Sequence, residues 1–223
     1  MREIRGVMVR DTLSELVDPA AAAIVVIDMQ NDFCHPDGLF AKAGKDTTAI
    51  REMLPRAVSF VETARRLGVR VIFVQQTTLR DDRSDSPAYL RFKVRDDKAP
   101  DYTLEGTWGW QYIDEMNLRP DDFVVRKSRS DAFLHTNLDQ VLRAARIETM
   151  VVIGPVTEGC VEATVRSGLH HDYYVVVVRD CVASVNKALH EGSMRLMEAR
   201  HIMANSDELL AAWKAHAEAA GRA

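Results

Sequence analysis

What this sequence lacks excludes several classes of protein. No apolar run approaches the roughly 20 residues that a membrane span needs, and residues 1–10 lack the apolar core of a signal peptide. We therefore expect neither a membrane span nor a targeting leader. Positive charge is not in excess, because the formal net charge is -4, so nucleic-acid binding through bulk charge has little support. The three cysteines, an odd number, argue against a disulfide framework and favour a reducing, cytoplasmic compartment.

The chain also lacks any feature that would divide it. It has no repeat at a fixed period, no low-complexity tract and no linker, so we expect a single domain over residues 1–223. Hydrophobic residues make up 47% of the sequence and charged residues 28%, an ordinary globular mixture that can bury a sizeable core.

Short β-rich apolar runs alternate with longer segments of helical periodicity. The branched residues of 22–28 predict a buried strand, and the apolar spacing of 48–67 predicts a helix. Further strands are predicted over 69–75, 122–127, 150–153, 173–178 and 201–204, and further helices over 138–145, 160–171, 187–200 and 206–219. Residues 77–109 are weakly periodic and are expected to run over the surface. Alternating strands and helices predict a three-layer α/β/α fold, Rossmann-like, with a mostly parallel sheet of about six strands.

Three reactive residues come at or just past predicted strands, and ligands bind at the carboxyl ends of such strands. Cys160 falls in the predicted first turn of a helix, whose positive end lowers a thiol pKa and can hold an oxyanion. Asp28 ends an apolar strand, where a carboxylate needs a cation or a shared proton. Lys127 also ends a strand. A packed thiol, a helix cap and a solvated lysine are the ordinary alternatives, and spacing alone does not show that the three residues meet.

Four segments, in order along the chain, resemble the isochorismatase-like hydrolases, also called the cysteine hydrolase family. They are residues 24–33 (IVVIDMQNDF), 127–133 (KSRSDAF), 152–161 (VIGPVTEGCV) and 177–184 (VVRDCVAS). The resemblance implies that Cys160 is the nucleophile, that Asp28 takes the thiol proton, and that Lys127 balances the charge. It also implies an oxyanion hole formed by the N–H groups of Val156 and Cys160, with a cis peptide bond before Val156.

The family's metal cluster is missing from this sequence. Nicotinamidases of the family carry an Asp-x-His cluster just after the second strand, where residues 75–80 here read QQTTLR, without a histidine. We therefore expect no catalytic metal and no cofactor. The adjacent His170 and His171 fit the end of a helix more simply.

The motifs also indicate a class of substrate. A retained Cys160 favours the C–N bond of an amide over the vinyl ether that isochorismatases cleave. Residues 157–162 and 106–110 look closest to amidohydrolases of ureido and carbamoyl compounds, such as ureidoacrylate, N-carbamoylsarcosine, biuret and triuret. A small-amide hydrolase resembling a nicotinamidase without its metal, and a non-catalytic binding or redox-sensitive subunit, are the alternatives.

Several side chains are candidates for contacts with the small-molecule substrate. Glutamines suit a urea edge and aromatic rings a planar ligand; the candidates are Phe33, Gln75, Gln76, Trp108, Trp110, Phe133 and Glu158. Arg129, with Arg91, Lys93 and Arg95, raises the possibility of a substrate carboxylate, although the last three also fit a solvated charge run. The resemblance further implies a homodimer or homotetramer, with residues 77–109 and the C-terminal helix that carries Trp213 as contact elements.

Overall fold

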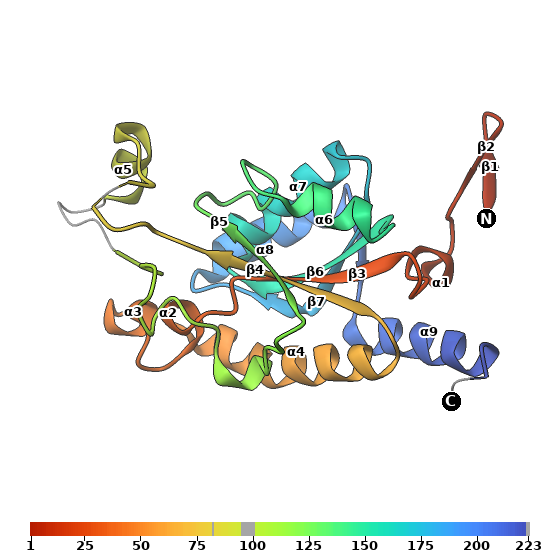
Figure 1. Cartoon of the computed structure of the whole chain (residues 1–223), viewed down its shortest axis with the longest axis horizontal. Helices are drawn as coiled ribbons and strands as arrows, with labels where there is room; N and C mark the ends of the chain where they lie inside the picture. Colours follow the sequence, from red (N-terminus) through yellow and green to blue (C-terminus); the bar gives the residue numbers. More distant parts are fainter. Residues whose placement is uncertain (82, 95–100, 222–223) are drawn as a thin grey trace.

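The computed structural model of the chain describes residues 1–81, 83–94 and 101–221, and its centre is one parallel sheet (Figure 1). The sheet has six strands in the order β5-β4-β3-β6-β7-β8, and every neighbouring pair is parallel. Its strands are β3 (Ala22–Ile27), β4 (Arg70–Gln76), β5 (Phe123–Lys127), β6 (Thr149–Pro155), β7 (Tyr174–Ala183) and β8 (Ile202–Ala204). The predicted parallel sheet is therefore confirmed.

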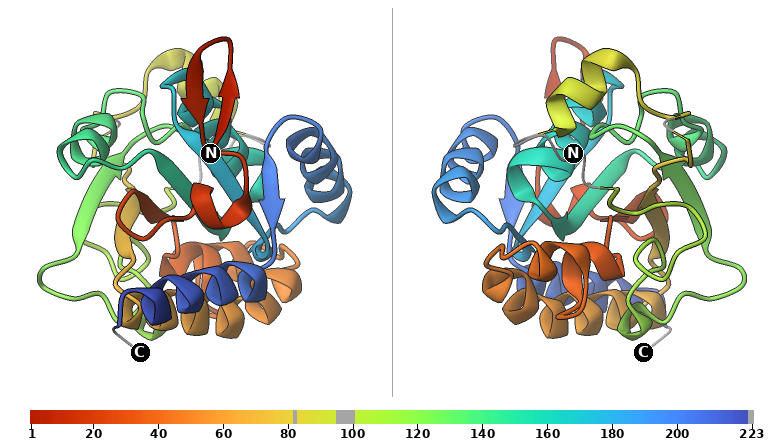
Figure 2. Two further views of the ribbon diagram at one scale, coloured as in Figure 1. Left: turned by 90° about the vertical axis from the view of Figure 1, so that its right-hand side faces the viewer. Right: turned by 90° about the vertical axis from the view of Figure 1, so that its left-hand side faces the viewer.

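Helices cover both faces of the sheet, so the predicted three layers are also confirmed (Figure 2). One face carries α4 (Thr48–Arg66) and α9 (Ser206–Ala219), and the other carries α6 (Leu138–Ala144), α7 (Glu162–His170) and α8 (Lys187–Glu198). We call these the α4 face and the α7 face. The shorter elements are α1 (Leu13–Leu16), α2 (Asn31–Cys34), α3 (Leu39–Lys42), α5 (Pro87–Lys93), the 3₁₀ turn η1 (Asp114–Met116) and the π-helix η2 (Thr157–Val161).

The two faces follow from the alternation of side chains along each strand. Along β3, Ile24 and Val26 pack toward α4 and α9, whereas Val25 and Ile27 pack toward α6 and α7. A strand that buries both faces is apolar throughout, and every residue of β3 is buried.

The C-terminal helix is part of this core. Trp213 stacks on Phe60 of α4 with ring centroids 5.4 Å apart, and its indole N–H donates to the carbonyl of Val17 at 2.7 Å. The Trp213 side chain is therefore fully buried within its own chain, and a subunit contact made by the rest of this helix stays a prediction.

The periodicity of the sequence missed the smaller elements. Residues 2–9 form a hairpin of β1 (Arg2–Ile4) and β2 (Val7–Val9), and the expected surface excursion contains α5. The helix expected from Cys160 is preceded by the π-turn η2, and β7 continues through Cys181. Among the described residues, no helix is both long enough and apolar enough to span a bilayer.

Candidate active site

The carboxyl ends of β3, β5 and β6 bring three side chains together. Lys127 is the last residue of β5, Asp28 follows β3, and Cys160 lies in η2, directly after β6. The Lys127 ammonium lies 2.8 Å from Oδ2 of Asp28 and donates to Sγ of Cys160 at 3.2 Å. The three residues that the sequence places far apart therefore meet in one cluster, in which Asp28 and Lys127 are buried and Cys160 is partly exposed.

Lys127 has three ammonium protons and three acceptors. Besides Asp28 and Cys160, its Nζ donates to Oε1 of Gln76 at 2.7 Å. Burial alone lowers the pKa of this lysine, but its interactions with the Asp28 carboxylate and with the sulfur of Cys160 outweigh burial, so its pKa is raised. Lys127 is therefore a fixed, fully buried cation.

Cys160 rests as a neutral thiol. Burial raises its pKa to about 12; the Lys127 ammonium lowers the pKa, and the Asp28 carboxylate raises it. The expectation of a thiol pKa lowered by the helix end is therefore wrong, because the loss of hydration on burial is the larger effect. Attack by this sulfur requires that its proton be removed at the same time.

Asp28 is the acceptor available for that proton. Apart from its ion pair with Lys127, neither carboxylate oxygen has a hydrogen-bond partner in the described part of the chain, and both are buried. The backbone of Asp28 has a positive φ of 49°, which breaks the alternation of β3. Its N–H nevertheless continues the pairing with β4 by donating to Val74.

A glycine allows the strands to approach at this point. Gly154 in β6 has φ 148°, and a Cβ there would lie 2.3 Å from the carbonyl oxygen of Ile27. Any other residue would push β6 away from β3, and with it the turn that carries Cys160.

The turn after β6 differs from the expectation in one respect. No peptide bond among the described residues is cis, so the predicted cis bond before Val156 is wrong. The chain turns instead through a left-handed Val156 (φ 59°, ψ 64°), whose carbonyl accepts from the N–H of Gly159 at 2.9 Å. The oxyanion hole of Val156 and Cys160 N–H groups stays a prediction.

Two residues that the sequence did not single out, His190 and Ser184, contact side chains of η2. Thr157 is buried, and its hydroxyl lies 2.8 Å from Nδ1 of His190 on α8. Glu158, whose contact with substrate stays a prediction, accepts from the hydroxyl of Ser184 at 2.9 Å, just past β7. None of the hydrogen bonds described for Glu158 joins it to the Asp28, Lys127 and Cys160 cluster.

Gln75 and Gln76 lie on opposite faces of β4. Gln76 reaches Lys127 on the α7 face, whereas Gln75 donates to the backbone carbonyl of Trp110 at 3.0 Å on the α4 face. The structure therefore brings only Gln76 to the cluster. Gln30, which the sequence did not single out, holds Gln76 by accepting from its N–H at 2.8 Å and donating to its carbonyl at 3.0 Å.

The first of the aromatic candidates, Phe33, packs against other aromatic side chains. Phe33 is buried against Phe40 and Tyr102, with ring centroids at 4.9 and 5.7 Å. Burial raises the pKa of the Tyr102 hydroxyl, and the neighbouring Tyr89 raises it further.

The remaining aromatic candidates have partners of their own. Phe133 stacks on His171 and Tyr173 within the α7 face. Trp108 is 46% exposed, and Trp110 donates its indole N–H to Thr77.

Two of the basic residues considered for a substrate carboxylate, Arg129 and Lys93, contact other residues of the chain. Arg129 lies over the ring of Tyr89 at 3.9 Å and donates to the carbonyl of Ser84 at 2.8 Å. Lys93 forms an ion pair with Asp85 that is buried on both sides. Arg91 is exposed, and Arg95 lies outside the described residues.

The structure also shows where metal ligands do not gather. Within residues 1–81, 83–94 and 101–221, no three or more His, Cys, Asp or Glu side chains form a group that could hold a metal ion. The absence of a catalytic metal and of a cofactor stays a prediction, for which chelation is the test.

Comparison with known proteins places the chain in a family. The Isochorismatase domain matches residues 22–211. Ureidoacrylate amidohydrolase RutB from Methylorubrum extorquens is 32% identical over 192 residues, which cover 81% of this chain and 77% of that protein. N-carbamoylsarcosine amidase from Thermoplasma acidophilum is 30% identical, with a TM-score of 0.67 over 84% of this chain and 97% of that one.

A further crystal structure supports the fold. A cysteine hydrolase from Pseudomonas syringae pv. phaseolicola 1448A has a TM-score of 0.78 at 24% identity, covering 90% of this chain and 96% of that one. Fold and site together define an α/β/α protein with an Asp-Lys-Cys cluster at the ends of its strands. The chain belongs to the isochorismatase family.

Proposed function

We propose that this protein is a cysteine-dependent amidohydrolase that cleaves a C–N bond of a small ureido or carbamoyl compound. The observation that carries the proposal is the Lys127 ammonium, which contacts both the Asp28 carboxylate and the Cys160 sulfur. Two relatives at about one-third identity are named for amidohydrolysis of such compounds, ureidoacrylate and N-carbamoylsarcosine. Biuret and triuret belong to the same chemical class.

The first step forms an acyl-thioester. As Sγ of Cys160 bonds to the ureido carbonyl carbon, the thiol proton moves to Asp28 and the carbonyl π electrons move to oxygen. The positive charge of Lys127 stabilises the thiolate that develops on Cys160 and keeps Asp28 ionised before it accepts the proton. Collapse of the tetrahedral oxyanion breaks the C–N bond, and Asp28 returns the proton to the leaving nitrogen.

The second step restores the thiol. Water attacks the thioester while Asp28 takes one of its protons, and the C–S bond breaks as that proton passes to the sulfur. The products are an amine or ammonia and a carbamic acid, which decomposes to carbon dioxide and further ammonia or amine. The N–H groups of Val156 and Cys160 would hold the oxyanion in both steps, and one such donor is commonly worth about 2.7–4 kcal/mol.

The test is ammonia release over a panel of ureidoacrylate, N-carbamoylsarcosine, biuret, triuret and nicotinamide, with and without EDTA. We expect turnover of a ureido compound at a rate that EDTA does not change, and loss of that turnover in Cys160→Ala. Cys34→Ala is the matched control, because Cys34 is buried and has no contact with Lys127 among the described hydrogen bonds. Activity that a chelator abolishes and zinc or iron restores would contradict the proposal.

A further inference from the structure

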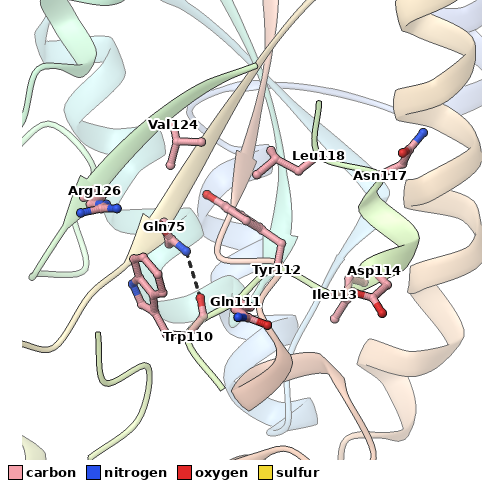
Figure 3. Close-up of a pocket in the computed structure, with 10 residues that line it drawn as sticks. All are labelled: Gln75, Trp110, Gln111, Tyr112, Ile113, Asp114, Asn117, Leu118, Val124 and Arg126. Atoms are coloured by element: carbon pink, nitrogen blue, oxygen red, sulfur yellow. Dashed lines mark hydrogen bonds between the residues drawn. The ribbon is translucent and has the colours of Figure 1, made fainter. Parts of the chain in front are cut away.

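A pocket of about 750 Å³ lies on the α4 face of the sheet (Figure 3). Val124 and Arg126 of β5 and Gln75 of β4 line one side of it, and Trp110 and Tyr112 line the other. Cys160 packs on the α7 face, and alternation along β5 places Lys127 with Val125 on that face, opposite Val124 and Arg126. Strands β4 and β5 therefore separate this pocket from the cluster. The pocket is therefore distinct from the site proposed for catalysis.

The lining of the pocket fits an uncharged, planar molecule with amide-type groups. Its charged members are one acid, Asp114, and one base, Arg126, whose charges balance. The Tyr112 side chain is only 8% exposed, and its buried hydroxyl has no hydrogen-bond partner among the described residues. Such a group is costly to bury alone and favours a ligand that offers it a partner. Val124 and Leu118 provide apolar surface for a flat ring, and the Arg126 guanidinium lies over the Trp110 ring at 4.9 Å from its centre.

A continuous series of hydrogen bonds joins this pocket to Lys127. The backbone carbonyl of Trp110 accepts from the side-chain amides of Gln75 at 3.0 Å and Gln30 at 2.7 Å. Gln30 in turn bonds both the N–H and the carbonyl of Gln76, and the Gln76 side chain accepts from Lys127. A shift of the Trp110 backbone on ligand binding would therefore pass to Gln30, then to Gln76, and from Gln76 to the Lys127 ammonium that contacts Cys160.

The geometry points to this pocket as a second binding site, for a small uncharged aromatic amide or ureide, that is coupled to Cys160 through Trp110, Gln30, Gln76 and Lys127. The site goes beyond the proposed function, and it does not require turnover to be observed. Its ligand acts by moving Lys127 relative to the thiol rather than by entering the reaction.

Benzamide is the probe, because it combines a flat ring with one amide. Calorimetric titration of the Cys160→Ala protein is expected to show saturable one-to-one binding, and Tyr112→Phe in the same background to weaken it about fivefold by removing one hydroxyl. Val124→Trp, which fills the pocket, is expected to abolish binding. Phe123→Ala is the matched control on the same strand, because the Phe123 side chain is exposed and does not line the pocket. Circular dichroism verifies that each variant is folded.

The coupling has its own readout in the wild-type protein, the rate at which iodoacetamide alkylates Cys160. Benzamide is expected to change this rate at least twofold, with a midpoint equal to its dissociation constant, and Val124→Trp to remove the change.

Absence of saturable binding, or binding that neither pocket variant weakens, would overturn the site. Binding without any effect on alkylation would overturn the coupling. An oligomer whose interface covers the pocket would also overturn the proposal. None of these results depends on amidohydrolase activity, so failure of the proposed function is distinguishable.

Discussion

The ammonium of Lys127 lies 2.8 Å from the carboxylate of Asp28 and donates to the sulfur of Cys160 at 3.2 Å, so one buried cation contacts both partners of the proposed proton transfer. Because the side chains of Lys127 and Asp28 are 0% and 2% exposed, neither charge is tolerable without the other.

Removing one partner of this pair is expected to be more destabilising than removing both. Lys127→Met leaves an uncompensated buried carboxylate and should lower the free energy of unfolding by about 3–5 kcal/mol. Asp28→Asn combined with Lys127→Met removes both charges and should recover a substantial part of that loss. Urea denaturation of the double-mutant cycle measures the difference. Arg143→Met, which breaks an exposed ion pair with Asp139, is the control and should change the free energy of unfolding much less than Lys127→Met does. Strictly additive losses for Asp28 and Lys127 would contradict a coupled pair.

Gln76 is expected to act as a positioning residue through Lys127. Gln76→Leu removes one of the three acceptors of the ammonium and should lower kcat about tenfold or more, with a smaller change in KM. Gln75→Leu is the matched control, because the neighbouring side chain points to the other face of the sheet, and it should change kcat by less than about threefold. Steady-state ammonia release measures both. Equal losses in the two variants would show that the contact with Lys127 is not the cause.

The reactivity of Cys160 should rise steeply with pH. Because burial raises its pKa to about 12, the folded protein favours the neutral thiol, and the thiolate fraction should grow about tenfold per pH unit between about pH 7 and pH 10. Lys127→Met should slow alkylation, because the ammonium lowers this pKa. Iodoacetamide labelling followed by peptide mass spectrometry measures the rates, with the fully buried Cys34 and Cys181 as slower internal controls. A plateau near neutral pH would show a preformed thiolate.

Arg129 is expected to support the α5 region rather than to select a carboxylate. Its guanidinium already lies on Tyr89 and bonds the carbonyl of Ser84, so Arg129→Met should reduce kcat/KM for carboxylated and neutral substrates by similar factors. Activity on ureidoacrylate and biuret, measured side by side, tests this. A loss confined to ureidoacrylate would identify Arg129 as the group that binds the carboxylate.

The layers of the fold could be predicted from periodicity, whereas the small elements could not. In long elements such as β3 and α4, the spacing of apolar residues in the sequence itself predicts which side chains are buried and therefore the type of element. The short helix α2 and the loop at Thr103 depend on contacts across the chain, because the Asp32 carboxylate accepts from the N–H of Thr103 at 2.6 Å. The π-turn η2 escaped prediction because its residues would equally fit the first turn of an α-helix.

The candidate site was predictable in position but not in its interactions. Strand ends and the family resemblance pointed to Asp28, Lys127 and Cys160, and the structure brings them together. Strict alternation along β4 could have separated Gln75 from Gln76, since successive side chains face opposite ways. The raised pKa of Cys160 could not be predicted from the sequence, because it depends on how deeply the folded chain buries the sulfur.

The most direct test of the account is to trap the acyl-enzyme. The protein is mixed with a substrate from the ureido panel, quenched in acid during turnover, and digested for mass spectrometry. We expect the acyl group of the substrate on the peptide that contains Cys160, and no adduct in Cys160→Ala. Turnover by the wild-type protein with no adduct at Cys160, or sustained turnover by Cys160→Ala, would contradict the central claim that this thiol is the nucleophile.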